Sequence, residues 1–464
     1  MSNIFVFDVG KTHIKCQLLD DAGVSVFSRS MDNRVLSTQE YPCADTQGIW
    51  QWLLATLGEA AARCCIDVIS ISTHGATAAL INRNEADCAL VLPVLDYEYA
   101  GVACVNDDYD ALRPNFSETY SPALPAGLNL GRQLYWQQSQ FSERFAQVSD
   151  ILLYPQYWAW CLTGQLCSEV SSLGCHTDLW SPGQADFSSL VSRQHWRALF
   201  PSIKPAWDTL GLVKPVLRKQ LGLTDSCCVT VGVHDSNASF LRYKRAQKEK
   251  AFTVISTGTW SIVMASGVSL DNLDARRDTL ANVDVYGEAV ACARFMGGRE
   301  YEAVCLLSHA ALDEPFTQKH LQILIDSKVI AVPDFSGGSG PFAGAEGCLK
   351  GDVPEGCGAA LASLYCALML DYQLDLLAAQ GDIFIEGAFL KNALLCAVLA
   401  QLRINQTVYL SADDTGTVKG CAYLADWSGE GEALNSRSCV STSLLGLDDY
   451  KNYWRHHAQK EMNN

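Results

Sequence analysis

Short apolar runs alternate with polar turns at the start of the chain, and the spacing of apolar residues then changes. The runs predict strands at 3–8, 13–19 and 24–29. Residues 45–64 carry apolar positions at helical spacing, with Asp45 or Thr46 placed to cap the helix. A further apolar run at 67–73 predicts another strand. This β-β-β-α-β order is typical of an α/β domain with a mixed sheet.

A similar beginning recurs in the second half of the chain. An apolar run, a turn and a second run occupy 252–256, 257–259 and 260–265, at a constant offset of 248 from the first hairpin. Strand-glycine-strand patterns are common, so the match can arise by chance. The alternative is a duplicated domain with a cleft between the halves. The basic run at 241–250 precedes the second start and predicts a boundary near residue 245.

The remaining second half predicts a loop, a strand and helices. Residues 333–347 are rich in glycine and indicate a functional surface loop, whereas 358–378 are apolar on nearly all sides and predict a buried helix. A strand at 382–385 and a helix with small residues at 416–427 follow. Residues 429–464 are polar and predict a peripheral tail that ends in a helix.

Composition and charge exclude several classes of protein. The chain has 464 residues and a formal net charge of −17, which disfavours general binding to nucleic acid or to an anionic membrane. No apolar stretch approaches the length of a transmembrane helix, and the start resembles no signal peptide. The 19 cysteines lie scattered on apolar faces, so we expect reduced thiols and a cytoplasmic location.

Two glycine turns are candidate phosphate sites. In the first, Asp8 ends a buried strand, Gly10 allows a tight turn, and Lys11, Thr12 and Lys15 add hydrogen-bond donors. A carboxylate beside a phosphate site is reasonable if Mg²⁺ lies between them. The second turn, 256–259, offers hydroxyls and amides of the same kind from Thr257, Gly258 and Thr259. The alternative for both is an ordinary hairpin turn.

Two further strand ends carry polar residues. His234 and Asp235 follow an apolar strand, where α/β folds place ligand chemistry, and Asp235 could act as a general base. The alternative is that Asp235 caps a helix over 236–243. After the strand at 382–385, Gly387 and Asn392 lie in a turn and helix start that would suit a nucleoside and its phosphates.

These motifs occur in an order that resembles the FGGY carbohydrate kinases, in particular rhamnulokinase and L-fuculokinase. The similar strings are SISTHGA (70–76), LPVLDYE (92–98), LLYPQYWAWCLTG (152–164), VGVHDSNAS (231–239), STGTWSIVM (256–264) and MGG (296–298). The resemblance implies an α/β fold of two actin-like, ribonuclease H-like domains around a central nucleotide and sugar cleft. It implies an N-terminal sugar-binding domain at 1–245, a C-terminal nucleotide-binding domain at 246–430 and a tail at 431–464.

The resemblance also implies a reaction and a set of roles. ATP would phosphorylate a primary hydroxyl of a small sugar, Asp235 would be the general base, and Asp8 would hold Mg²⁺. Phosphate and nucleotide contacts are expected from Gly10, Lys11, Thr12, Lys15, Thr257, Gly258, Thr259, Gly387 and Asn392. Sugar contacts are expected from His74, Gly75, Glu98, Gln156, His234 and Asp235. Partners would be the sugar and ATP, without nucleic acid or membrane, and a homodimer is the usual assembly of the family.

Three departures from the family pattern affect specificity. Lys11 replaces the usual hydroxyl residue, Glu386-Gly387-Ala388 replaces a glycine-rich triplet, and Glu98 stands for the usual sugar-binding Asp, with Asp96 as a competitor. The strings favour a ketose resembling rhamnulose, fuculose, xylulose or ribulose, whereas the longer Glu98 could select a tetritol. A non-catalytic sugar or nucleotide sensor and a phosphatase of the same superfamily are the alternative functions.

Overall fold

The computed structural model describes residues 2–37, 40–85, 89–411, 416–428 and 433–462. The chain forms two compact units. The first contains Met1–Ala246, Asn282–Ala289 and Thr415–Glu432, and the second contains Gln247–Ala281, Val290–Asp414 and Ala433–Asn464. The first unit thus includes two later segments that the sequence prediction assigned to the second domain. The predicted boundary at 430 lies outside the described residues.

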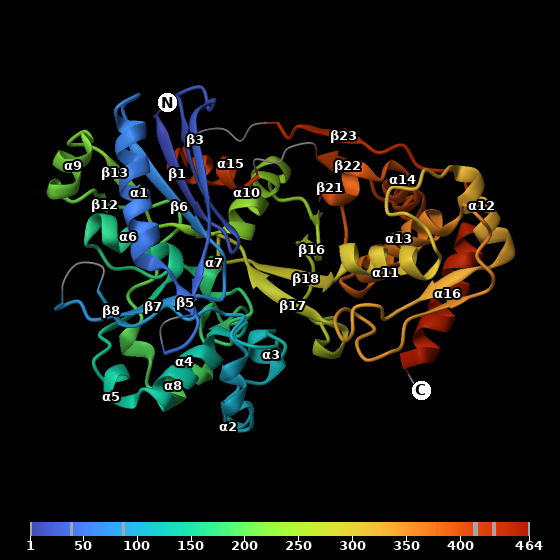
Figure 1. Ribbon diagram of the computed structural model, residues 1–464, viewed down its shortest axis with the longest axis horizontal. Helices are drawn as coiled ribbons and strands as arrows, with labels where there is room; N and C mark the ends of the chain where they lie inside the picture. The colour runs from blue at the N-terminus through green and yellow to red at the C-terminus, as the bar shows by residue number, and fades with distance from the viewer. Residues whose placement is uncertain (1, 38–39, 86–88, 412–415, 429–432, 463–464) are drawn as a thin grey trace. The chain divides into compact units, whose positions relative to one another are not determined.

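A mixed sheet forms the centre of the first unit (Figure 1). Its strands, in spatial order, are β12 (Thr209–Leu212), β13 (Cys228–Thr230), β6 (Val68–Thr73), β1 (Ile4–Val9), β2 (His13–Leu19) and β3 (Ser25–Asp32). The short strand β14 (Val233–His234) continues beside β6, in parallel with it. Because β1, β6 and β14 run in the same direction, their carboxyl ends lie at one edge of the sheet.

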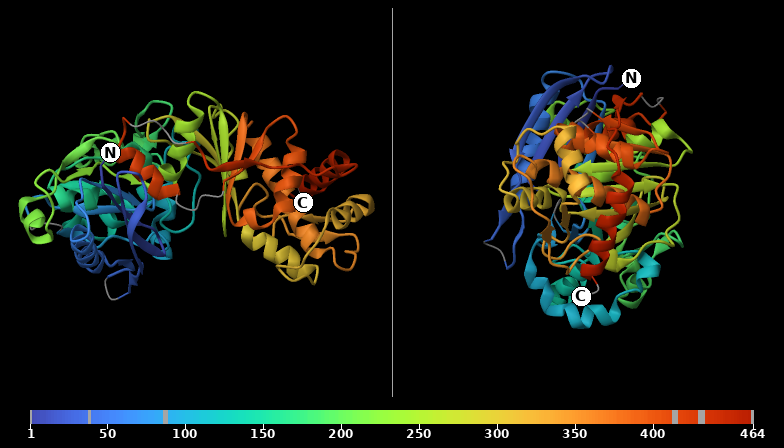
Figure 2. Two further views of the ribbon diagram at one scale, coloured as in Figure 1. Left: turned by 90° about the horizontal axis from the view of Figure 1, so that it is seen from above. Right: turned by 90° about the vertical axis from the view of Figure 1, so that its right-hand side faces the viewer.

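The alternation of side chains along β1 assigns its two faces to different helices. Phe5, Phe7 and Val9 belong to a core formed with α1 (Thr46–Ala61) and α6 (Tyr154–Thr163). Ile4 and Val6 belong to a second core with α10 (Asp235–Gln247) and α15 (Gly416–Ala425). Both helical layers can be followed in Figure 1 and Figure 2. By alternation Asp8 lies on the second face, which places a carboxylate beside α15.

The segments that return to the first unit are joined to it by close packing. Gly420 of α15 lies so near the carbonyl of Ala238 in α10 that a side chain there would overlap it. Trp427 stacks on Trp207 with ring centroids 4.0 Å apart, and Tyr286 packs against both rings. These contacts explain why the two segments belong with the first unit although the second unit separates them from it in sequence.

A second mixed sheet forms the centre of the second unit. Its strands, in order, are β17 (Thr279–Val283), β18 (Ala289–Phe295), β16 (Ser261–Ser266), β15 (Phe252–Thr257), β21 (Asp382–Gly387), β22 (Val408–Ser411) and β23 (Ser436–Ser438). The helices α11 (Gly297–Leu307), α12 (Gln318–Ser327), α13 (Gly358–Leu376), α14 (Ala393–Leu402) and α16 (Leu447–Met462) supply buried residues to its core. The predicted buried helix is therefore α13.

The two sheets repeat the same local arrangement. β1 pairs with β2 in antiparallel and with β6 in parallel orientation, as β15 does with β16 and β21. The bounds of β15 are those of β1 moved by the offset of 248. In the first hairpin Val9 lies opposite Ile14, and in the second Thr257 lies opposite Ser261, so the second turn is one residue shorter. The predicted α/β fold of two domains is confirmed.

Two local expectations differ from the structure. Much of the basic run at 241–250 is not a linker but the end of α10, whose Leu241 and Tyr243 are buried. The terminal helix α16 forms as expected, yet it is not peripheral, because Trp454 and Tyr450 pack into the core of the second unit. Their spacing of four residues places them on one helix face, a stripe that the polar composition of the tail conceals.

Candidate active site

Asp8 and its turn form the first part of the site. The Asp8 carboxylate accepts a hydrogen bond from the Ser72 hydroxyl at 3.1 Å. Burial and the nearby negative charge of Asp235 raise the pKa of Asp8 to about 7, while Lys15, its neighbour on β2, lowers it to a smaller extent. In the turn, the Gly10 N–H donates to the carbonyl of His13 at 3.0 Å. This bond keeps the hairpin turn tight after Asp8.

His234 and Asp235 lie where β14 meets α10. The His234 Nε2 is 3.2 Å from the Asp235 carboxylate, and burial lowers the pKa of His234. Asp235 accepts from the Ser236 N–H at 2.6 Å, whereas a helix cap normally bonds the amide two or three residues ahead. Its side chain is 30% exposed. The geometry therefore differs from a usual N-cap and leaves the carboxylate accessible.

A buried relay holds the backbone beneath this pair. The Ser171 hydroxyl accepts from the His234 N–H at 3.2 Å and donates to Glu169 at 2.6 Å. Glu169 is fully buried and caps the short helix α7 (Val170–Leu173) by accepting from two of its amides. Burial raises the pKa of Glu169 to about 7. The end of β14 is thus fixed from a separate segment of the first unit.

The turn at His74 and Gly75 packs directly on His234. A side-chain carbon on Gly75 would lie 2.9 Å from the His234 Nε2, so only glycine fits without displacement. The His74 ring contacts the rings of Tyr97 and Tyr154, with centroids 5.5 and 5.3 Å away. Burial lowers the pKa of His74, with a smaller contribution of the same sign from Lys11. Burial beside these rings thus favours the uncharged form of the His74 imidazole.

Lys11 and Gln156 both contact groups of the first unit itself. The Lys11 ammonium forms an ion pair with Asp96, lies 3.4 Å from Glu98, and lies over the Tyr97 ring. The Asp96 side chain is 10% exposed and that of Glu98 66%. Gln156 is completely buried and donates to the carbonyls of Val231 and Gly232, so its amide group braces the strand before His234.

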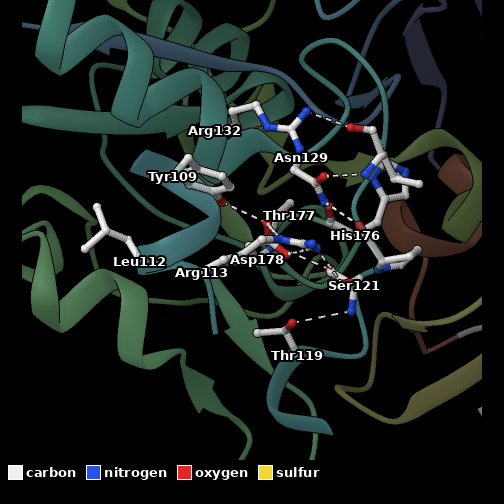
Figure 3. Close-up of polar contacts among 12 residues, drawn as sticks. Tyr109, Leu112, Arg113, Thr119, Ser121, Asn129, Arg132, His176, Thr177 and Asp178 are labelled. Atoms are coloured by element: carbon white, nitrogen blue, oxygen red, sulfur yellow. Dashed lines mark hydrogen bonds and ion pairs between the residues drawn. The ribbon is translucent and has the colours of Figure 1, made fainter. Parts of the chain in front are cut away.

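The loop after α7 completes this part of the first unit (Figure 3). Its Cys175 lies 3.8 Å from the His234 ring. The loop is anchored by Asp178, a buried carboxylate that accepts from Arg113 at 2.8 and 2.9 Å and from the Tyr109 hydroxyl. Asn129 donates to the carbonyl of His176 at 3.0 Å. These bonds fix a turn whose His176 and Asp178 have φ values of 43° and 66°.

The second unit contains the other predicted residues. Gly258 donates to the carbonyl of Trp260 at 2.9 Å, which forms the turn that also contains Thr259. The Thr257 hydroxyl donates to the carbonyl of Glu386 and accepts from the Phe389 N–H, at 2.6 and 2.9 Å. Thr257 therefore links β15 to the turn after β21. Its hydroxyl, which we expected to bind phosphate, is engaged in these two bonds.

A cavity of about 580 Å³ opens beside this turn. Its walls include Tyr301, Pro315, Phe316 and Phe389, and its polar lining includes Asn392 and Lys391. Asn392 caps α14 by accepting from Leu395 at 3.0 Å and donates to Ser363 at 2.8 Å. The size and mostly apolar walls suit a flat heterocycle.

The residues present are compatible with Mg²⁺. Among the described residues no group of three or more His, Cys, Asp and Glu side chains could hold a metal alone. Mg²⁺ usually binds through one or two carboxylates together with phosphates and water. Asp8 matches this mode. Burial and the negative charge of Asp235 raise its pKa, and a bound cation would stabilise the ionised carboxylate against both effects.

Both halves of the chain match domains of a known protein family. Residues 3–241 match the N-terminal domain of the FGGY family of carbohydrate kinases, and residues 249–433 match the carbohydrate kinase FGGY C-terminal domain. The chain belongs to the FGGY family of carbohydrate kinases. Members of this family are phosphotransferases that act on an alcohol group. In the described part of the chain, no helix has the length and apolar character needed to cross a membrane.

Several relatives of this FGGY protein are known. A probable L-xylulose kinase of Pasteurella multocida is 25% identical over 61% of this chain and 59% of its own length. An L-fuculokinase of Escherichia coli K12 is 22% identical over 58% and 57%. The chain thus matches less than two thirds of the length of these curated relatives.

Solved structures extend the likeness over the whole chain. A carbohydrate kinase from Novosphingobium aromaticivorans is 34% identical with a TM-score of 0.91, and the match covers 99% of both chains. A ligand-bound xylulose kinase from Lactobacillus acidophilus shares the fold at 14% identity and a TM-score of 0.77, over 100% of this chain and 97% of its own.

The structure thus brings the predicted residues together within each unit. Asp8, His74, Gly75, His234 and Asp235 gather at the strand ends of the first unit. Thr257, Gly387 and Asn392 gather beside the cavity of the second. Sequence reasoning missed the cavity walls at Tyr301 and Phe316, because isolated aromatic residues give no local signal of a pocket.

Proposed function

We propose that this FGGY protein is an ATP-dependent kinase that transfers the γ-phosphoryl group of ATP to a primary hydroxyl of a small ketose. The observation that carries the proposal is Asp235, an accessible carboxylate at the strand ends beside Asp8 and His74. The relatives named L-xylulose kinase and L-fuculokinase support a ketose. The homodimer and the cytoplasmic location remain predictions.

In the proposed reaction each residue has a limited task. Asp235 accepts the proton of the attacking sugar hydroxyl, and His234 and the Ser171 relay keep its backbone in place. Bound Mg²⁺, held by Asp8, would neutralise charge on the phosphates. The turns at 10–12 and 257–259 contribute backbone amides, and the cavity beside Asn392 holds the nucleoside. Positioning and charge then supply most of the rate acceleration.

Measurement of ADP release tests this function. The panel contains L-xylulose, D-xylulose, ribulose, rhamnulose, fuculose, erythritol, glycerol and gluconate, each with Mg²⁺ and ATP. We expect turnover with at least one ketose, and Asp235→Asn to lower it by about 10²–10⁴-fold with folding unchanged. Asp225→Asn, which changes an exposed carboxylate of the same unit, is the matched control.

The result also separates the alternatives. A sensor would bind a panel sugar or ATP in calorimetry but release no ADP above background. A phosphatase would release phosphate from a sugar phosphate without ATP. Turnover confined to erythritol would replace the ketose with a polyol, and wild-type turnover in Asp235→Asn would disprove the assignment of the base.

A further inference from the structure

Lys11 faces a different part of the first unit from the one its sequence position suggests. It follows Gly10 in the candidate phosphate turn, yet its ammonium is held by the segment 96–98. It pairs with Asp96, lies 3.4 Å from Glu98 and lies 4.5 Å from the centre of the Tyr97 ring. A cation with two carboxylate partners and an aromatic face is already compensated. It is therefore poorly placed to serve as an uncommitted phosphate ligand.

The ion pair lines a small cavity of the first unit. The cavity measures about 20 Å³, and its lining includes Lys11, Asp96, His74, Tyr97 and Thr77. This volume holds one water molecule, the size of a single hydroxyl group. The negative charge of Asp235 acts to raise the pKa of both His74 and Tyr97, so the cavity that these residues line is near the proposed base.

The two carboxylates beside Lys11 differ in what they can contact. Asp96 is 10% exposed, accepts from the Glu98 N–H at 3.2 Å, and lines the cavity. Glu98 is 66% exposed and is not among the residues that line the cavity. Burial of a carboxylate is costly unless its charge is paired, and Lys11 supplies that pairing and holds the Asp96 carboxylate in place.

We propose that Lys11 belongs to the sugar site, where it positions Asp96 to accept a hydrogen bond from a hydroxyl group of a neutral sugar. This rests on the proposed kinase function and deepens it. Among the Lys, Arg, Asp and Glu side chains that line the cavity, Asp96 is accompanied by two cations, Lys11 and Arg34. The Asp96 carboxylate accepts hydrogen bonds from hydroxyl groups and would repel the carboxylate of a sugar acid placed beside it, which favours a neutral polyhydroxyl compound at this position.

The first arm of the test measures nucleotide affinity and requires no sugar. Calorimetry with Mg²⁺ and a non-hydrolysable ATP analogue compares wild type, Lys11→Met and Lys15→Met. We expect Lys11→Met to bind the analogue within about twofold of wild type. Lys219→Met, an exposed lysine of the same unit, controls for loss of one positive charge. Weakening by about tenfold in Lys11→Met alone would assign Lys11 to the phosphates and overturn the inference.

The second arm uses the panel ketose with the highest wild-type kcat/KM. Lys11→Met and Asp96→Asn should each raise its KM by about tenfold or more. The double variant should be no worse than the poorer single variant, because both changes remove one pair. Multiplying effects, or an unchanged KM in Lys11→Met, would contradict the positioning role.

Gluconate supplies the last comparison. Asp96→Asn removes a negative charge and leaves Lys11 less compensated, so the kcat/KM ratio of gluconate to the ketose should rise. A falling ratio would refute the charge argument. If wild type releases no ADP with any panel compound, the proposed function fails, whereas the nucleotide arm still decides where Lys11 acts.

Discussion

Replacement of Glu300 by glutamine should stabilise the second unit relative to wild type, and this gain should grow as the pH rises from 5 to 8. Glu300 lies on α11 and is 1% exposed. Its carboxyl group accepts a hydrogen bond from the Tyr365 hydroxyl of α13. Burial, with a smaller contribution from Asp334, raises the pKa of Glu300 from 4.5 to about 8. Glutamine can keep the hydrogen bond with Tyr365 but cannot ionise.

The sign follows from proton binding in the two states. Between pH 4.5 and 8 the unfolded chain has lost the Glu300 proton, whereas the folded chain retains it. Folding therefore takes up a proton, and the Glu300 contribution to stability decreases as pH rises through this window. From pH 5 to pH 8 the loss is about 3–4 kcal/mol, since one pKa unit corresponds to about 1.4 kcal/mol. Above pH 8 the difference levels off.

Hydrogen exchange of α11 and α13 peptides measures this local stability without assuming that both units unfold together. The exchange free energy of Glu300→Gln minus wild type should rise by about 3–4 kcal/mol between pH 5 and pH 8, after correction for the intrinsic rate. Glu302→Gln changes an exposed residue of the same helix and should show no such trend. A constant difference across this range would refute the reasoning.

Three other predictions concern packing and charge. Asp371→Asn should lower the free energy of unfolding by about 3–5 kcal/mol in urea titrations, because this fully buried carboxylate pairs with three cations. The control Asp375→Asn changes a carboxylate that is 41% exposed and should lower it by less than about 1 kcal/mol. Gly387→Ala should abolish ADP binding in calorimetry, since Gly387 has φ 86° and a side chain would overlap the Thr257 carbonyl; normal affinity would contradict this. Asp178→Ala should lower stability by about 3–5 kcal/mol in urea titrations, and a loss below 1 kcal/mol would refute the network in Figure 3.

The hairpins of both sheets could be predicted from sequence because their signal is local. Short apolar runs define β1 and β15, and a glycine marks each turn. His234 and Asp235 were found in the same way, since an apolar strand leads directly to them. Lys11 was named for its place beside Gly10, but its side chain pairs with Asp96, and no local pattern specifies that long-range contact.

Hydroxyl and amide groups were harder to assign, because many partners compete for them. The Thr257 hydroxyl bonds the Glu386 carbonyl and the Phe389 amide, and the Gln156 amide bonds two carbonyls before His234. From the sequence alone, a threonine hydroxyl or a glutamine amide is as able to bind a ligand as to bind a backbone group. Only the register of neighbouring strands decides whether a backbone partner is within reach, and that register depends on the whole sheet.

The returning segment 415–432 shows how a site can depend on residues remote in sequence. Its helix α15 packs on the face of the sheet that carries Asp8, and the charge of Asp8 contributes to the raised pKa of the buried Cys421 thiol. The close approach of Gly420 to Ala238 fixes α15 against α10, the helix that begins with Asp235. The surroundings of both proposed functional carboxylates are therefore completed by a helix that the chain reaches only after it has built most of the second unit.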